Sequence, residues 1–204
     1  MNERALDVRL AWRAAALGLL LVAAACRGTP RAPSELAWIQ PPGESWEGWT
    51  SRAYPGNALG PGLLVESIPT EERWDRWVHM VTTQFLEGAE ETPRELMERI
   101  LARYAERCSA LESTVLAEDE ASLTYEWWID ACPSAPDQHE VARILRGDHG
   151  LHRVAFVARG PRMSPELRGE WLDRLAGARV LERGEAVTPE SGTGASTGSG
   201  PGTP

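Results

Sequence analysis

The sequence predicts an α+β domain in which two helices pack on an antiparallel sheet of about six strands. Two helix-start signals, Thr92-Pro93-Arg94-Glu95 and Ser164-Pro165-Glu166, flank four segments with strand-like alternation. A turn signal, Gly147-Asp148-His149-Gly150, joins the last two of these segments as a hairpin. Consecutive antiparallel strands combined with few helices are typical of the α+β class.

Two strands are expected before the first helix. Residues 63–68 form a short apolar run that ends at Pro69-Thr70. Residues 74–86 alternate well enough for a longer strand, with Trp77, Val81 and Phe85 on one face. The preceding residues 37–62 are rich in Gly and Pro, which predicts a loop-rich segment whose Trp side chains pack onto the domain.

The first helix begins with a capping box, in which Thr92 is the N-cap and Glu95 is the N3 residue. Pro93 suits the first helical position. The helix is expected to extend to about Cys108, because one apolar stripe continues to that residue. Its members are Leu96, Met97, Ile100, Leu101, Tyr104 and Cys108.

Four strands and a helix are expected after Cys108. The strands cover residues 113–117, 123–132, 139–146 and 151–159. In the second of them Leu123, Tyr125, Trp127, Ile129 and Ala131 share one face. Ser164 caps the last helix, and Gly177 lies near its end. The inner face of this helix consists of Leu167, Trp171, Leu172 and Leu175.

This order of elements resembles the PsbP-like fold, which is found in several small bacterial lipoproteins. The stretch from Glu71 to Gln84, with Trp77 and Val81-Thr82-Thr83-Gln84, is similar to a strand pattern in uncharacterised exported proteins. The resemblance covers about residues 63–181, and its motifs are structural. It implies the fold and a binding or assembly role, and it assigns no catalytic residues.

Residues 1–25 are expected to be a signal peptide. Basic residues near the N-terminus precede a run of 12 residues without a polar side chain, residues 14–25. This run is shorter than the ~20 residues that a membrane-spanning helix needs. Its end, Leu21-Val22-Ala23-Ala24-Ala25-Cys26, resembles a bacterial lipobox, which implies that Cys26 carries a lipid. Ala23 stands where lipoboxes usually carry Leu, and Ala-x-Ala also suits ordinary signal peptidase, so secretion without lipid is the alternative.

The mature chain is expected to have three parts. Residues 26–36 are rich in Pro and form a tether. Residues 37–183 form the single domain, and residues 184–204 form a disordered Gly/Ser/Thr/Pro tail. Arg27 follows Cys26 where an Asp would resemble an inner-membrane retention signal. The expected location is therefore the periplasmic face of the outer membrane, with a soluble periplasmic or secreted protein as the alternative.

Cysteine usage supports export. Once Cys26 is assigned to the lipid, Cys108 and Cys132 remain as an even pair in an oxidising compartment and are expected to form a disulfide. Two buried free thiols are the alternative. The spacing excludes Cys-x-x-Cys redox chemistry and zinc ribbons.

Charge excludes several functional classes. The 204-residue chain has 30 acidic residues and 21 basic residues, all of them Arg, and a net charge of -9. Such a chain has no electrostatic footprint for nucleic acid. The absence of Lys from the sequence excludes Schiff-base enzymes, Walker A phosphate loops and Ser-x-x-Lys acyl enzymes.

A search for reactive clusters assigns no catalytic residue, metal ligand or cofactor. A metal site would need at least three of the histidines and carboxylates to converge, and His139, His149 and His152 near the hairpin are the nearest approach to such a set. Glu118-Asp119-Glu120 is interpreted as a solvated acidic turn.

Tryptophan is unusually frequent, with nine residues in the chain. Trp77, Trp127 and Trp171 are expected in the core. Trp128 points to the opposite sheet face, where either the Trp-rich segment covers it or it is exposed. An exposed Trp128 near Trp46 and Trp49 would form an aromatic binding surface for a glycan, a peptide or a protein.

These observations together predict a non-enzymatic, lipid-anchored cell-envelope protein that binds or helps to assemble another envelope component. Its expected partners are the membrane, through the lipid, and an unknown envelope protein or glycan. A secreted or anchored hydrolase or metal-dependent enzyme is the alternative.

Overall fold

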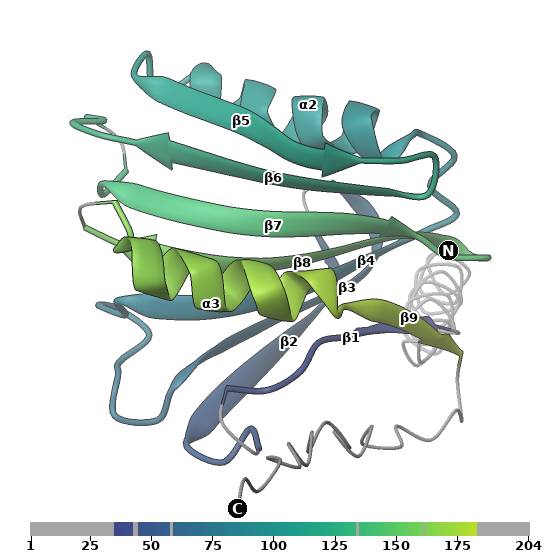
Figure 1. Cartoon of the computed structure of the whole chain (residues 1–204), viewed down its shortest axis with the longest axis horizontal. Coiled ribbons are helices and arrows are strands. Elements are labelled where there is room, and N and C mark those ends of the chain that lie inside the picture. The colour runs from purple at the N-terminus through teal and green to yellow at the C-terminus, as the bar shows by residue number, and fades with distance from the viewer. Residues whose placement is uncertain (1–34, 43–44, 58, 134, 161, 183–204) are drawn as a thin grey trace, which may run out of the picture.

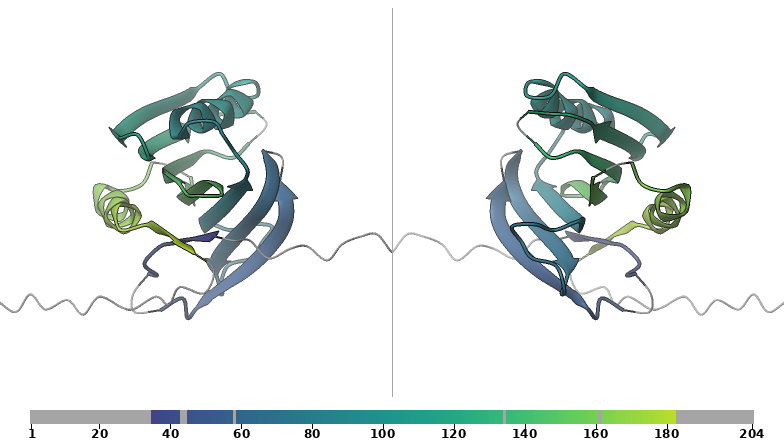
Figure 2. Two further views of the ribbon diagram at one scale, coloured as in Figure 1. Left: turned by 90° about the vertical axis from the view of Figure 1, so that its right-hand side faces the viewer. Right: turned by 90° about the vertical axis from the view of Figure 1, so that its left-hand side faces the viewer.

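A seven-stranded antiparallel sheet forms the centre of the domain, and one helix packs on each of its faces (Figures 1 and 2). The structure is a computed structural model that describes residues 35–182, apart from 43–44, 58, 134 and 161. The strand order is β2-β3-β4-β8-β7-β6-β5, and a separate two-stranded sheet pairs β1 with β9. In chain order the elements are β1 (Glu35–Trp38), β2 (Trp49–Asn57), β3 (Gly60–Pro69), β4 (His79–Glu87), α2 (Pro93–Ala105), β5 (Leu111–Glu118), β6 (Ser122–Ile129), β7 (Gln138–Arg146), β8 (Gly150–Arg159), α3 (Pro165–Ala176) and β9 (Arg179–Glu182).

The α+β class with an antiparallel sheet is confirmed, but the expected count of about six strands is too low. The three strands that the sequence analysis missed are β1, β2 and β9. Strands β1 and β9 have four residues each, which is too short for a periodic signal. Strand β2 lies at the sheet edge, carries Pro55 and Gly56, and exposes residues 51–55, so it lacks an apolar face.

Strand β4 begins at His79, five residues later than expected. The carboxylate of Glu72 accepts hydrogen bonds from the backbone N–H groups of Val78 and His79, which closes a turn before the strand. Trp77 therefore packs with Met80, and the prediction that it shares a face with Val81 and Phe85 is wrong.

Helix α2 begins as predicted, with both hydrogen bonds of the Thr92–Glu95 capping box in place. It ends at Ala105, three residues before Cys108. Its apolar side packs on the face of the sheet that carries Tyr125, Trp127 and Ile129. Helix α3 is capped by Ser164 and packs on the opposite face, where it forms a second apolar cluster.

The first described strand, β1, is held in place by a buried carboxylate. Glu35 is 1% exposed, and its Oε2 lies 2.9 Å from Nε2 of His152, which is fully buried. Its Oε1 accepts a hydrogen bond of 2.9 Å from the backbone N–H of His149. Burial by itself would raise the pKa of Glu35, but these hydrogen bonds together lower it, so the carboxylate stays charged. Glu35 lies in the range assigned to the tether, so the ordered part of the domain starts earlier than residue 37.

Gly147 makes room for this carboxylate, and we expect Gly147→Ala to lower the free energy of unfolding by about 1–3 kcal/mol. A Cβ at this position would lie 2.2 Å from Oε2 of Glu35 and would displace it from His152. The measurement is urea unfolding followed by tryptophan fluorescence. The same substitution at Gly169 in α3 is the control, because a Cβ there meets nothing within 4 Å and should be neutral or stabilising.

A double-mutant cycle with Glu35→Ala identifies the group that clashes. In the Glu35→Ala background, which lacks the carboxylate, we expect Gly147→Ala to lower the free energy of unfolding by much less. An equal loss in both backgrounds would show that Glu35 is not the group displaced.

Candidate ligand-binding site

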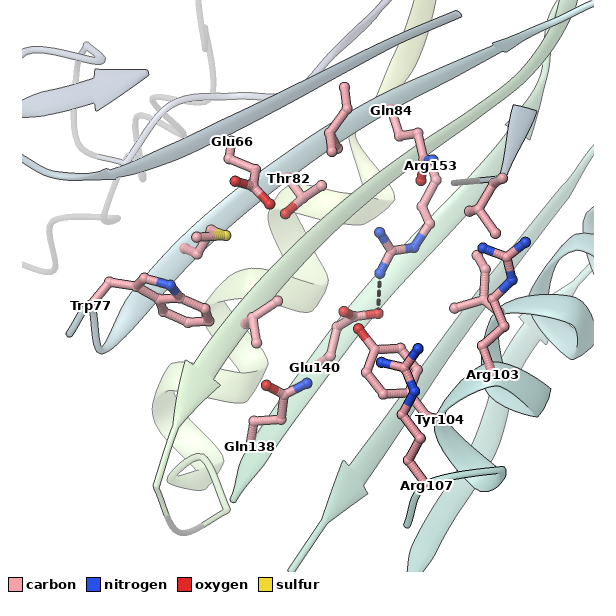
Figure 3. Close-up of a pocket in the computed structure, with 15 residues that line it drawn as sticks. Glu66, Trp77, Thr82, Gln84, Arg103, Tyr104, Arg107, Gln138, Glu140 and Arg153 are labelled. Atoms are coloured by element: carbon pink, nitrogen blue, oxygen red, sulfur yellow. Dashed lines mark hydrogen bonds and ion pairs between the residues drawn. The ribbon is translucent and has the colours of Figure 1, made fainter. Parts of the chain in front are cut away.

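A pocket of about 390 Å³ opens between α2 and strands β3, β4 and β8, on the face of the sheet on which α2 packs (Figure 3). It exists because α2 packs over β6 and β7 and leaves the β3–β4 half of the same face uncovered. Polar and charged side chains line part of it, and apolar side chains line the rest. The polar set is Glu66, Thr82, Gln84, Arg103, Tyr104, Arg107, Gln138, Glu140 and Arg153; the apolar set is Leu59, Leu64, Trp77, Met80, Ile100 and Val157.

A buried ion pair between Arg153 of β8 and Glu140 of β7 lies at the centre of the pocket wall. The two residues are 7% and 2% exposed. Oε1 of Glu140 accepts hydrogen bonds from Arg153 and, at 2.7 Å, from the indole N–H of Trp127. Nε of Arg153 also donates to the hydroxyl of Tyr125 at 3.2 Å. Both charges are therefore neutralised and held in place by neighbouring side chains.

The protonation states of this cluster follow from its surroundings. Burial by itself would lower the pKa of Arg153, but Glu140 and Tyr125 outweigh it and raise the pKa, so the guanidinium stays charged. Burial raises the pKa of Tyr125 to about 12, so its hydroxyl keeps its proton. The carboxylate of Glu140 is tied to a permanent cation, an arrangement that suits a structural ion pair better than a general base.

The two ends of the pocket differ in character. Glu66 and Trp77 lie at one end, and Arg103, Tyr104 and Arg107 of the α2 region lie at the other (Figure 3). Burial raises the pKa of Glu66, although Tyr54 and Arg52 oppose the shift. Burial also raises the pKa of Tyr104, and the charge of Glu140 adds to this effect. The α2 end carries Arg103 and Arg107 and is therefore the cationic end of the pocket.

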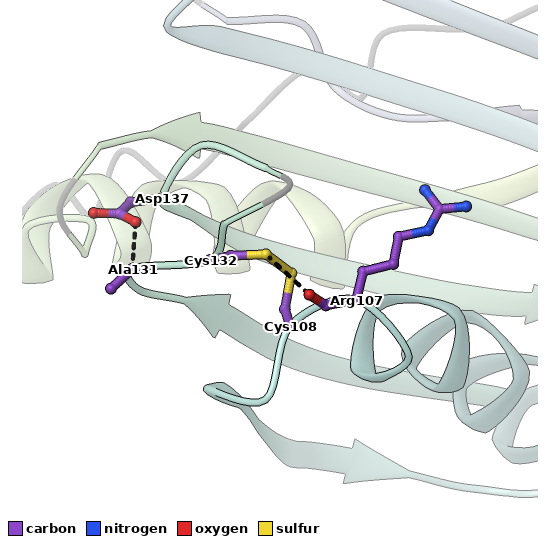
Figure 4. The surroundings of a disulfide bond; sticks show 5 residues. All are labelled: Arg107, Cys108, Ala131, Cys132 and Asp137. Atoms are coloured by element: carbon purple, nitrogen blue, oxygen red, sulfur yellow. Dashed lines mark hydrogen bonds between the residues drawn. A yellow bond between two sulfur atoms is a disulfide. The ribbon is translucent and has the colours of Figure 1, made fainter.

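A disulfide between Cys108 and Cys132 holds the end of α2 against the segment that follows β6 (Figure 4). This is the pairing that the cysteine count predicts. Sγ of Cys132 lies 3.7 Å from the carbonyl oxygen of Arg107, the residue next to Cys108. The carboxylate of Asp137 accepts a 2.6 Å hydrogen bond from the N–H of Ala131, which has a positive φ of 53°. The crosslink thus positions the cationic end of the pocket.

The aromatic surface considered for Trp128, Trp46 and Trp49 is not formed. Trp128 is buried, with Arg162 stacked 3.8 Å from the centre of its ring. Trp46 and Trp49 are half-buried and pack edge-on against each other, and Trp49 packs edge-on against Trp171 of α3. Of the two alternatives for Trp128, burial and exposure, the structure shows burial, because α3 and the loop before it cover this sheet face. The Trp-rich segment packs on α3, and Arg162 covers Trp128.

The histidines near the hairpin do not converge. His139 lies 3.3 Å from Glu126 and accepts from the N–H of Met163, while His152 is bonded to Glu35. His149 lies exposed in the turn. Among the residues that the structure describes, no three side chains of the metal-binding types come together.

The acidic turn is held by local bonds. Glu118 forms an ion pair with Arg94, and Asp119 accepts hydrogen bonds from the backbone of Ala121 and Ser122. Neither contact creates a site, in agreement with the interpretation of a solvated turn.

Several predicted features lie outside the described residues: the signal peptide 1–25, the lipid-bearing Cys26, the tether up to residue 34 and the tail 184–204. In the part of the chain that the structure describes, no helix has the length and apolar character needed to cross a membrane.

Comparisons with known proteins do not assign the pocket. No protein-family model matches the chain, and a search of curated proteins also finds no match.

Glu140 and Arg153 were not predicted as pocket residues, although the sequence contains a signal for them. The predicted hairpin places both charges on one face of two apolar strands, where each needs a partner. Arg103 lies beside the apolar stripe of α2, and Arg107 lies in the turn after the helix; arginines at such positions are usually solvated.

Proposed function

We propose that this protein is a non-enzymatic, lipid-anchored component of the cell envelope that binds another envelope component in the pocket between α2 and β3, β4 and β8. The observation that carries the proposal is the pocket itself, which is open to solvent, partly apolar and cationic at one end. Its volume falls within the range of about 300–1,000 Å³ that is typical of small-molecule sites. A fold of the PsbP-like kind is part of the proposal, since the observed order contains the expected sequence of elements.

The lipid anchor at Cys26 would keep the domain at the membrane surface. Glu35, the first residue that the structure describes, follows Cys26 by nine positions, which span at most about 30 Å when fully extended. The net charge of -9 supplies no attraction to an anionic lipid surface. Retention at the membrane would therefore depend on the lipid.

Filling the pocket tests the binding role. We expect Leu64→Trp to prevent the protein, purified from its native envelope, from retaining a bound component that native mass spectrometry detects on the wild-type protein. Leu64 lines the pocket, whereas its neighbour Leu63 points to the opposite face of β3. Leu63→Trp is therefore the matched control, and circular dichroism checks the fold of both variants.

Equal retention by Leu64→Trp and the wild type, or no bound component on either, would contradict the pocket as the binding site. The enzymatic alternative predicts instead a stoichiometric metal ion in the purified protein or turnover of an ester or amide substrate.

Mass spectrometry of the mature N-terminus tests the anchor. Cleavage before Cys26 with a mass increase from acyl chains is the expected result. An unmodified N-terminus, or cleavage at another position, would favour the secreted alternative.

A further inference from the structure

The pocket contains two arginines that lack a counter-charge. The guanidinium groups of Arg103 and Arg107 make no hydrogen bond or ion pair with any residue that the structure describes. Their neighbours differ in this respect, because Arg99 binds Glu91 and the carbonyl of Leu59, and Arg153 binds Glu140. Arg103 and Arg107 are the arginines of the pocket whose guanidinium groups have no carboxylate partner among the described residues.

The spacing of these arginines adds a second argument. Arg103 lies in the last turn of α2, and Arg107 lies four positions later in the turn that follows Ala105, where the hydrogen bond from the N–H of Cys108 to the carbonyl of Tyr104 continues the helical path; the two side chains therefore emerge on the same side. Like charges at this spacing repel each other, and an anion bound between them would remove the repulsion. Figure 3 shows both side chains extending from the α2 region along the pocket.

The carboxylates of the pocket are already engaged. Glu140 accepts hydrogen bonds from Arg153 and Trp127. Glu66 lies at the far end of the pocket from the arginines, and its partner across the strand pair is Arg52. An anion that pairs with Arg103 and Arg107 inside the pocket would therefore come from a ligand. Guanidinium groups match the planar oxygens of a carboxylate or a phosphate in geometry and charge.

The remaining surface of the pocket indicates what the rest of the ligand is. Apolar side chains from the sheet, Leu64, Met80 and Val157, line the pocket opposite the α2 region that carries the arginines. The volume of about 390 Å³ is near the lower limit for small-molecule sites, which suits one apolar chain.

We propose that the pocket binds a single-chain amphiphile with an anionic headgroup, a carboxylate or a phosphate monoester, whose headgroup contacts Arg103 and Arg107 and whose chain lies against Leu64, Met80 and Val157. This inference rests on the proposed function, because it assumes that the pocket is the ligand site.

Three probes with the same chain test the headgroup: dodecanoate, dodecyl phosphate and dodecanol. Isothermal titration calorimetry of the full mature protein, below the concentration at which micelles form, should give one saturable site for the anions. We expect at least one of the anions to bind about tenfold more tightly than dodecanol, and the tighter of the two identifies the headgroup.

Single variants locate the headgroup. Arg103→Gln and Arg107→Gln should each weaken binding of the anion about tenfold and leave dodecanol within about twofold of its wild-type affinity. Arg94→Gln removes the same charge from the other end of the same helix, where Arg94 pairs with Glu118, and should leave all three affinities unchanged. Both side chains are exposed, so we expect these variants to fold as the wild type does.

The outcomes separate this inference from the proposed function. Dodecanol binding as tightly as both anions, or anion binding that is unaffected by Arg103→Gln and Arg107→Gln, would overturn the anionic headgroup and leave a pocket for neutral ligands. Failure of all three probes to bind would overturn the amphiphile, while the Leu64→Trp experiment would still decide whether the pocket binds another component.

Discussion

Replacing Arg153 with Met is expected to lower the free energy of unfolding by about 3–5 kcal/mol, the largest effect of any single substitution considered for this domain. The change leaves the carboxylate of Glu140, which is 2% exposed, without its cation, and it removes a partner from the hydroxyl of Tyr125. Urea unfolding followed by tryptophan fluorescence and by circular dichroism measures the loss.

Two further variants give this prediction its controls. The double variant Glu140→Leu/Arg153→Met removes both charges, so we expect it to recover much of the loss. Arg73→Met breaks the ion pair between Arg73 and Asp75, two side chains that are each 64% exposed, and should leave the free energy of unfolding nearly unchanged. If Arg153→Met costs no more than Arg73→Met, the buried pair does not contribute to stability as proposed.

Removal of the disulfide by Cys108→Ala/Cys132→Ala is expected to lower the free energy of unfolding by about 3 kcal/mol. The bond joins residues separated by 24 positions and therefore restricts a loop of moderate length in the unfolded chain. The same variant frees the end of α2, so we also expect weaker binding of ligands that contact Arg107. Urea unfolding measures the first effect, and calorimetric titration measures the second.

Reduction of the wild-type protein provides the matched comparison. Wild-type protein in excess reductant should unfold at nearly the same urea concentration as the double variant. An oxidised wild type that is no more stable than the variant would show that the crosslink does not restrict the unfolded chain.

Much of the fold was predictable from local chemistry. The capping box of Thr92 and Glu95 and the N-cap of Ser164 marked the start of both described helices, because capping depends on residues within one turn. The alternation of Leu123, Tyr125, Trp127 and Ile129 identified a strand face that is fully buried in the structure. These signals need no knowledge of distant residues.

The missed elements lack such signals. Strands β1 and β9 are stabilised by pairing with each other and, at Glu35, by contacts with His149 and His152, which are more than 100 positions away. The position of Trp128 was similarly undetermined, because alternation shows which side of a strand a residue occupies and not what covers that side. Here Arg162 covers the ring of Trp128, and α3 packs on the same face of the sheet.

The sequence by itself determined the α+β class, the starts of the two described helices, the hairpin at residues 147–150 and the pairing of Cys108 with Cys132, because each depends on local spacing or on simple counting. Only the tertiary structure determined the pocket, since its charged and apolar walls come from β3, β4, β7, β8 and α2. A charged residue is recognised as paired or unpaired only when its neighbours in space are known. For that reason Arg153 proves to be a structural cation, whereas Arg103 and Arg107 emerge as the candidate anion-binding pair.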